Sequence, residues 1–525
     1  MKRLAITLLI AAALISGCAR PKAQSDVLIY AMKSEPITLN PVMASEISSK
    51  TVNSVIFSSL VKYDENLEIV PDLAERWESD ASGRVWIFHL RRDARWHDGE
   101  PFTSEDVEFT FDRLFDPATN TFNRGMFMAN GKKPEVRADG PHRVKITLPS
   151  PFAPFISNLP SLGIIPKHIL IGKDINRNEF NWNPVGTGPF RFAKWSSGEK
   201  IYVKANEDYY GGRPLLKGIM FTIIPSSESR RIALLTGCAD IGEVTSEDLR
   251  ALEGSPILDI HRWDQYLYFY LGFDLTNPLF QDRKLRKAIN LSIDKESIIR
   301  AVYKKNATRA KGPIPPASPY YRNDLDGYPA DYERAKGLLE DSGWKTGPDG
   351  VRAKDGKRLS FETIYASSSA DTEKAAVFMQ AQLKKSGIEM RLKSMEFSSL
   401  IDRCYPGKFQ SLIFNWSEEM DPDEFTVWHS SQRGDDGMNF MGYSNAEADA
   451  LLEKGRTTYK KEERLRIYGR FQEIVVDDSP YVFLWTPKGI AATNKRVKGL
   501  SRPGPAGLLI NSERITIKEG SDEKP

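Results

Sequence analysis

The sequence contains few of the residues that catalytic and metal sites use most. Its 525 residues include three cysteines and six histidines, and no histidine lies four residues from another. The chain therefore lacks the H-E-x-x-H helix of zinc peptidases, and it also lacks the G-x-S-x-G turn of serine hydrolases. Cys238 and Cys404 have no histidine or asparagine near them in sequence. We therefore predict no catalytic residues and no metal ligands.

The charge of the chain is nearly balanced. Lysine and arginine number 73 and aspartate and glutamate number 70, which gives a formal net charge of +3. A nucleic-acid partner would require a basic patch, and the dispersed charge offers none. The glycines of Gly186-Thr187-Gly188-Pro189 depart from the dinucleotide fingerprint, because Arg191 stands where the third glycine belongs. We expect no cofactor.

Long apolar runs are also lacking. The run from Leu4 to Leu14 is shorter than the ~20 residues that span a bilayer, and it follows Lys2 and Arg3, as in a secretory signal. The small residues Ser16 and Gly17 precede Cys18, which is similar to the lipobox of bacterial lipoproteins. We predict a signal peptide over 1–17, a lipid anchor on Cys18 and a tether over 18–25, with a frayed tail at 518–525. An exported protein could form a disulfide between Cys238 and Cys404, and the sequence leaves this open.

Helix and strand patterns alternate along the rest of the chain, which predicts an α/β fold. Three apolar runs are interpreted as strands buried on both faces, at 85–90, 200–205 and 219–224. Helices are expected to start after capping residues, with apolar side chains following at helical spacing. The expected caps are Thr103, Asp331 and Ser444, and a further helix carries Tyr468, Phe471, Ile474 and Val475.

Several ordered segments resemble the family 5 bacterial extracellular solute-binding proteins, the oligopeptide-, dipeptide- and nickel-binding receptors of ABC importers. The longest match runs from Phe88 to Val107 and includes Trp96-His97-Asp98-Gly99, which we interpret as a turn and packing element. The other matching segments are Ser34–Pro41, Pro71–Trp77, Asn183–Phe190, Asn206–Pro214, Asp282–Asn290 and Gly442–Asn445.

The resemblance implies a two-lobed periplasmic binding protein with a ligand cleft between lobes joined by a hinge. Lobe I would comprise 26–50, 178–262 and 488–517, with an inserted subdomain over 51–177, and lobe II would comprise 263–487. The chain would cross between lobes at two linkers, and we expect linker points near Asn183–Pro189 and Thr486–Gly489.

The resemblance also suggests where a peptide would bind. Peptide-binding members have an element of the form W-x-x-D-x-D-P, whose first aspartate pairs with the α-ammonium of the ligand. Here Asn415 and Trp416 are followed by Glu418 and Glu419, and then by Asp421 and Pro422. Glutamate replaces the pairing aspartate, at Glu419 when counted from Trp416 or at Glu418 when counted back from Pro422.

Three further residues are candidates for the cleft. Trp416 and Phe440 would form its apolar wall, and Glu35 in the opening motif would face it. Arg403 is a candidate for the carboxylate of the ligand on position alone. Each of these residues has an alternative interpretation as ordinary core or surface, and the two glutamates could also be solvated loop charges.

The predicted function is capture of di- to oligopeptides and their delivery to the permease and ATPase of an ABC transporter, by a monomeric receptor anchored to a bacterial membrane through lipid. Alternative ligands are a nickel chelate or an oligosaccharide. An exported hydrolase and a structural or adhesive lipoprotein are the alternatives from other classes. The sequence does not decide between the inner and the outer membrane.

Overall fold

The computed structural model describes residues 26–434, 437–501 and 507–518, and the chain divides into two compact units. Unit 1 takes Met1–Arg262 and Ile490–Pro525, and unit 2 takes Trp263–Gly489. The chain passes between the units within two paired strands, β12 (Leu258–Asp264) and β21 (Tyr481–Asn494). Helices and strands alternate throughout both units, which confirms the predicted α/β class. The inserted subdomain at 51–177 stays a prediction.

The main sheet of unit 1 is built from both ends of its chain. Strand β1 pairs in parallel with β10 and with β11, whereas β11 pairs antiparallel with the last residues of β21. Its other pairs, between β10 and β9 and between β9 and β8, are antiparallel. The strands, in spatial order, are β8 (Phe190–Ser196), β9 (Lys200–Ala205), β10 (Gly218–Ile223), β1 (Val27–Met32), β11 (Ile241–Glu243) and β21.

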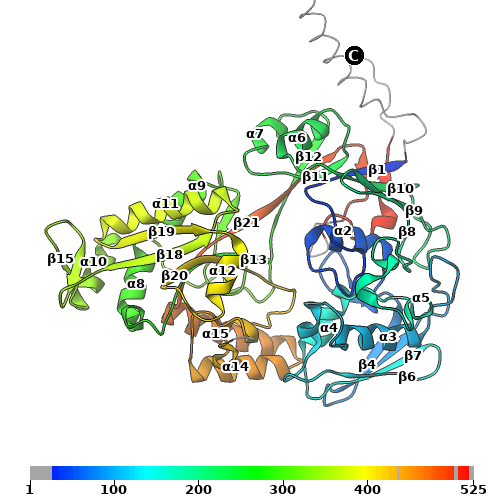
Figure 1. The fold of residues 1–525 in the computed structure, drawn as a ribbon, viewed down its shortest axis with the longest axis horizontal. Coiled ribbons are helices and arrows are strands. Elements are labelled where there is room, and N and C mark those ends of the chain that lie inside the picture. The colour runs from blue at the N-terminus through cyan, green and yellow to red at the C-terminus, as the bar shows by residue number, and fades with distance from the viewer. Residues whose placement is uncertain (1–25, 435–436, 502–506, 519–525) are drawn as a thin grey trace, which may run out of the picture. The chain divides into compact units, whose positions relative to one another are not determined.

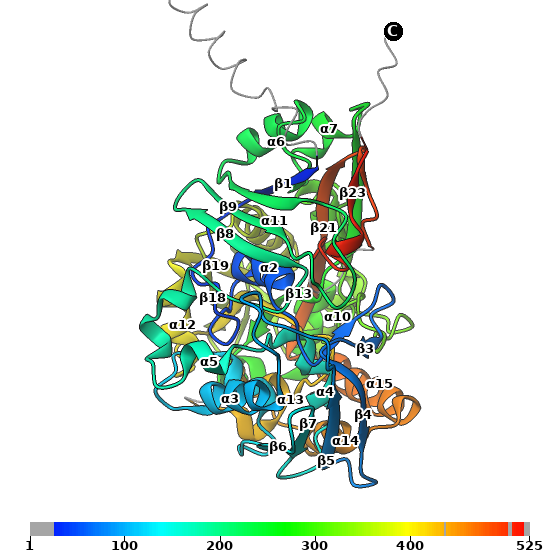
Figure 2. The ribbon, with the colours of Figure 1, turned by 90° about the vertical axis from the view of Figure 1, so that its right-hand side faces the viewer.

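Unit 1 also contains a four-stranded antiparallel sheet, which Figure 2 shows beside helix α3 (Ser104–Phe115). Thr103 is the N-cap of this helix as predicted, and its backbone N–H donates to Asp106 Oδ2 at 3.0 Å, as in a capping box. The strands, in order, are β4 (Ala74–Ser79), β5 (Val85–Leu90), β7 (Arg143–Thr147) and β6 (Glu135–Ala138). In two short pairs, β2 (Val61–Tyr63) pairs with β3 (Ile69–Pro71) and β22 (Val497–Lys498) pairs with β23 (Thr516–Ile517). The other α-helices of unit 1 in the described residues are α2 (Ile47–Ile56), α4 (Pro154–Asn158), α5 (Lys167–Leu170), α6 (Ser227–Leu235) and α7 (Leu249–Leu252).

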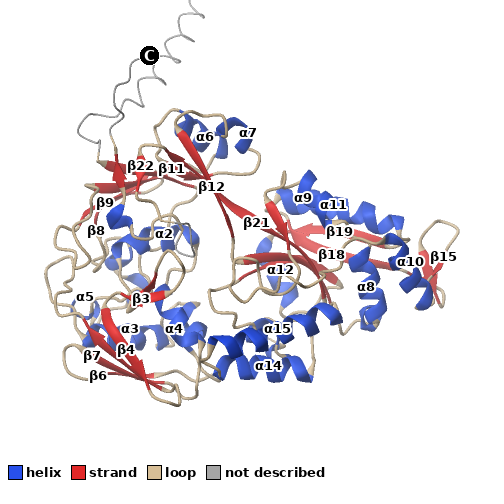
Figure 3. Cartoon of the chain, turned by 180° about the vertical axis from the view of Figure 1, so that it is seen from behind, coloured by secondary structure: helices blue, strands red, loops and turns tan. Residues whose placement is uncertain are grey.

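The sheet of unit 2 has a cluster of buried apolar side chains on each face. Figure 3 shows the strands of this sheet with helices beside them. Side chains alternate between faces along a strand, so Leu271 and Phe273 belong to one core cluster whereas Tyr268 and Tyr270 belong to the other. The strands, in order, are β19 (Glu389–Met395), β18 (Ser360–Ala366), β20 (Ser411–Ser417), β13 (Leu267–Phe273) and β21, with β14 (Ala307–Arg309) on β21 and a separate ribbon of β15 (Lys345–Thr346), β16 (Arg352–Lys354) and β17 (Lys357–Arg358).

Helices contribute to both cores of unit 2. Ala375, Met379 and Leu383 of α11 belong to one core cluster, and Tyr468, Phe471 and Val475 of α15 belong to the other, as the helical spacing predicts. The helices are α8 (Arg283–Leu291), α9 (Lys295–Ala301), α10 (Tyr332–Asp341), α11 (Ala370–Lys385), α12 (Phe397–Cys404), α13 (Phe425–Trp428), α14 (Ala446–Thr457) and α15 (Lys461–Asp478).

Two local predictions were wrong. None of the three strands predicted to be buried on both faces is so, since β5, β9 and β10 each have partly exposed residues between buried ones. Each of these strands belongs to a sheet with a partly exposed face. Helix α14 is capped by Asn445 and not by Ser444, since the Asn445 side chain accepts hydrogen bonds from the N–H groups of Glu447 and Ala448. Asp331 caps α10 as predicted.

The glycines at 186 and 188 do not form a crossover between lobes, since both lie within unit 1. Gly188 N donates to Ile56 O at 2.8 Å, and a Cβ on Gly186 would lie 2.0 Å from the same oxygen. His97 of the signature segment binds the same loop, with Nε2 donating to Gly188 O at 3.0 Å. These glycines are therefore required by close packing of the backbone on α2.

The two remaining cysteines do not form a disulfide with each other. Cys404 at the end of α12 is a free, buried thiol, and Cys238 lies in unit 1, where its Sγ accepts a hydrogen bond from Thr236. Cys18 and the rest of the predicted signal and tether lie outside the described residues, as does most of the predicted tail.

Candidate functional site

An aromatic wall stands where β20 ends in unit 2. Trp416 lies opposite Tyr268 of β13 in the antiparallel register, and its ring is stacked on Tyr270 with centroids 6.2 Å apart. The Phe440 ring lies 5.3 Å from Trp416, and Asn415 is half-buried in the strand beside it. The structure therefore brings Trp416 and Phe440 together, and Asn415 is the neighbour of Trp416 on the strand. The roles of all three residues in a binding site stay predictions.

The two glutamates follow directly after this strand and differ in environment. Glu418 N donates to Tyr266 O at 2.6 Å, which fixes the start of the loop against β13. Glu418 Oε1 is buried and has no hydrogen-bond partner among the described residues, whereas the Glu419 side chain is exposed. Burial, and after it the charges of Glu419 and Asp423, raise the pKa of Glu418 to about 8. Glu418 is thus a carboxyl group that lacks a counter-charge.

Arginines from the helices that follow anchor the loop. Both carboxylate oxygens of Asp421 accept hydrogen bonds from Arg464 of α15, at 2.6 and 2.7 Å, and the two side chains are 2% and 7% exposed. Asp423 forms an ion pair with Arg456 of α14, in which Oδ2 accepts a hydrogen bond from Nε at 3.0 Å. Charge-assisted pairs of this geometry hold a planar carboxylate in one orientation. In this structure Asp421 orients the loop, and its predicted contact with a ligand stays a prediction.

A further acid, which the sequence analysis did not select, lies deeper in the unit. Glu424 is 1% exposed, and its Oε2 has no hydrogen-bond partner in the described part of the chain. Burial, and after it the charges of Glu418 and Asp423, raise its pKa well above the usual range. The signal that could have drawn attention to it is acid density, since five of the seven residues from 418 to 424 are acidic.

The remaining candidates lie elsewhere. Glu35 is in unit 1, where it accepts hydrogen bonds from Trp195 Nε1 at 2.6 Å and from Gly198 N at 2.9 Å. Partial burial opposes its ionisation, but these hydrogen bonds outweigh the burial and lower the pKa of Glu35. Arg403 is half-buried on α12. The places of Glu35 and Arg403 in a ligand site stay predictions.

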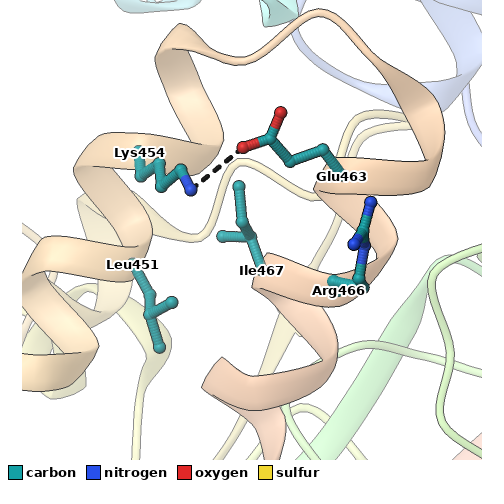
Figure 4. Close-up of a pocket in the computed structure, with 5 residues that line it drawn as sticks. All are labelled: Leu451, Lys454, Glu463, Arg466 and Ile467. Carbon is teal, nitrogen blue, oxygen red and sulfur yellow. Dashed lines mark ion pairs between the residues drawn. The ribbon is translucent and has the colours of Figure 1, made fainter.

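A separate pocket of about 310 Å³ lies between α14 and α15 (Figure 4). It is lined by Leu451 and Ile467, by Arg466, and by an ion pair between Lys454 and Glu463 of 2.9 Å. None of the predicted site residues lines it. Within the described residues, no group of three or more histidine, cysteine, aspartate or glutamate side chains could hold a metal ion, and no helix is long and apolar enough to cross a membrane.

Comparison with known proteins identifies the type of receptor. The family described as bacterial extracellular solute-binding proteins, family 5 Middle, matches residues 68–437. The chain is 31% identical to the oligopeptide-binding protein AppA of Bacillus subtilis, over 91% of this chain and 89% of that protein. The solved structure of AppA in complex with a nonapeptide covers 94% of this chain and 99% of its own, with a TM-score of 0.78.

A second solved structure is equally similar but has another ligand. NikZ of Campylobacter jejuni, in complex with Ni(L-His), is 30% identical, covers 94% of this chain and 99% of its own, and also has a TM-score of 0.78. The heme-binding protein A of Haemophilus influenzae is 28% identical over 91% of this chain and 90% of that protein. The matches share a fold and a receptor role and differ in solute. This chain therefore belongs to family 5 of the bacterial extracellular solute-binding proteins, which are solute receptors and not enzymes.

Proposed function

We propose that this receptor captures peptides by their N-terminal ammonium, with Glu418 and Glu419 as its partners. The observation that carries the proposal is the buried oxygen of Glu418, which has no partner in the described residues and lies next to the exposed Glu419. An ammonium is a compact cation with three donors, and it loses its hydration when it is enclosed. Two adjacent carboxyl groups offset that loss by charge-assisted hydrogen bonds.

The aromatic wall supports the same ligand. Trp416 and Phe440 offer apolar area to the first residues of a peptide, and the faces of their rings attract a cation. The relative with a bound nonapeptide is similar over nearly the whole chain. Because glutamate is one methylene longer than aspartate, the ammonium would lie about one bond length farther from the loop than in a receptor with aspartate.

The transport role belongs to the same proposal. The apolar leader over 1–17 and Cys18 support export and a lipid anchor, which would hold the receptor at the membrane where a permease and its ATPase work. These partners are proposed from the family, whose members include the oligopeptide-binding protein AppA.

A nickel chelate is the second candidate ligand, because the structure with Ni(L-His) matches this chain as well as the peptide complex does. The described residues provide no group of three metal-binding side chains, so the metal would have to arrive with its own chelator. The two candidates make different demands on the loop, since a chelate without a free ammonium has no need of Glu418.

The test is ligand-dependent thermal unfolding of the chain that begins after Cys18. The panel comprises di- to pentapeptides, the same peptides with acetylated N-termini, nickel–histidine and oligosaccharides. A peptide at 100 times its Kd should stabilise the protein by about 2.7 kcal/mol, and acetylation should remove the effect. Glu418→Gln or Glu419→Gln should weaken peptide binding, whereas Glu462→Gln, an exposed glutamate on α15, should not. Stabilisation by nickel–histidine alone would refute the peptide proposal.

A further inference from the structure

Glu418 and Glu424 of unit 2 each have one buried oxygen without a hydrogen-bond partner, and the two carboxyl groups differ in depth. Glu418 follows β20 and is half-buried, whereas Glu424 begins the turn into α13 and is 1% exposed. One oxygen of each, Oε1 of Glu418 and Oε2 of Glu424, is buried without a hydrogen-bond partner in the described residues. Neither carboxyl group forms an ion pair with another of the described residues.

The charged neighbours do not neutralise the pair. The two arginines that reach this loop are already engaged, Arg464 with Asp421 and Arg456 with Asp423. The buried hydroxyl of Tyr268 is also without a hydrogen bond, although its electrostatic environment includes both glutamates. The titratable and charged groups that face the two carboxyls are Glu419 and Asp423 of the same loop, Tyr268 and Tyr270 of β13, Tyr481 of β21, and Arg456 of α14 through Asp423.

Two negative charges could not persist in such a place, because desolvation and mutual repulsion both favour the neutral acids. Burial and neighbouring acids raise the pKa of both groups, and the deeper Glu424 is affected by the charge of Glu418. The group nearer the surface therefore ionises first, and the deeper one keeps its proton. A carboxylic acid kept neutral in this way acts as a donor and not as an anion.

We infer that the receptor exchanges a proton for the positive charge of its ligand: Glu418 loses its proton when an ammonium binds, and Glu424 remains a neutral acid that limits the inner site to one positive charge. In this step the Glu418 O–H bond breaks, the proton passes to solvent, and the carboxylate pairs with the ammonium. The inference has two parts. The ligand half, the release of a proton when a peptide binds, rests on the proposed function. The proton half, the raised pKa of Glu418 and Glu424, concerns the ligand-free protein as well.

The ligand half is tested by calorimetry at pH 7 with a tripeptide, in phosphate and in Tris, whose ionisation enthalpies differ. The dependence of the binding enthalpy on the buffer gives the number of protons released. The wild type should release close to one proton per peptide. Glu419→Gln should lower this number, because the charge of Glu419 contributes to the raised pKa of Glu418. Glu462→Gln is the matched control and should leave it unchanged. A wild type that binds peptide without releasing a proton overturns the inference and leaves the proposed function intact.

The proton half is tested without ligand, by NMR titration of the protein labelled with ¹³C at the glutamate carboxyl carbons. Glu418→Gln and Glu424→Gln assign the two resonances. The Glu418 signal should titrate above neutral pH, and Glu419→Gln should lower its midpoint. The Glu424 signal should still be that of the acid at a pH where the Glu418 signal is already that of the carboxylate. A Glu418 signal with an ordinary midpoint overturns the inference. If no peptide binds, the proposed function and the ligand half fail together, and this titration still decides the proton half.

Discussion

Replacing Asp421 with asparagine should destabilise unit 2 by about 3–5 kcal/mol, the usual cost of removing one partner from a buried ion pair. Asp421 receives two hydrogen bonds of 2.6 and 2.7 Å from Arg464, and the guanidinium is 7% exposed. An amide would accept only one of these bonds and would leave the arginine charge in the interior without compensation. The rings of Tyr320 and Tyr468, 5.5 and 5.4 Å from the guanidinium, cannot replace a carboxylate.

The assay is urea unfolding followed by tryptophan fluorescence, with Asp421→Asn, Arg464→Met and the double variant in one cycle. The double variant should lose much less free energy of unfolding than the two single variants together, because neither charge of the pair is then left buried alone. An exposed ion pair between α14 and α15 provides the control. Glu447 and Arg470 lie 2.8 Å apart but are 55% and 52% exposed, so Glu447→Gln should change the free energy of unfolding little. Equal costs at the buried and the exposed pair would refute this reasoning.

Three further predictions use the same unfolding assay or a simple reaction. Burial lowers the pKa of His97 to about 4, so unit 1 should lose stability as pH falls from about 6.5 to about 4. Between pH 7 and 5 the free energy of unfolding should fall by about 2 kcal/mol, and in His97→Gln it should vary less with pH. Gly186→Ala should cost about 3 kcal/mol or more, because its Cβ would meet a carbonyl oxygen at 2.0 Å, whereas Gly125→Ala, with open space around it, should be close to neutral. Burial raises the pKa of the Cys404 thiol to about 12, so this cysteine should react with a thiol reagent only as fast as unit 2 unfolds, and a rapid reaction in native protein would contradict its burial.

Local patterns predicted the parts of the fold that depend on neighbours in sequence. The capping aspartate at 331 and the apolar positions of α15 are set by contacts within a few residues, and both predictions were confirmed. The burial of β5 was misjudged because it depends on which strands pair beside it, and a single apolar run does not contain that information. Ser444 was chosen as a cap over its neighbour Asn445 because both residue types can cap a helix.

The candidate site was predictable only in part. The resemblance selected Trp416 and the two glutamates, the apolar character of binding sites suggested Phe440, and the structure places the two rings 5.3 Å apart. The partner of Asp421 could not have been selected, because Arg464 is 43 residues away and only folding brings it to the loop. Glu424 was missed for a related reason, since an acidic side chain is usually solvated and its burial follows only from the folded structure.

Strand β21, which runs from unit 2 into unit 1, determines the order in which the chain can fold as it is synthesised. Residues 263–489 are continuous, so unit 2 can close as soon as its last residues emerge. Unit 1 cannot, because β11 pairs with Ala491 to Thr493 and these residues follow the whole of unit 2. Until then, the first 262 residues present an open sheet edge, which is a template for wrong pairing. A chain that must wait for its last strand benefits from remaining unfolded through synthesis, which is the state in which a polypeptide can be threaded across a membrane.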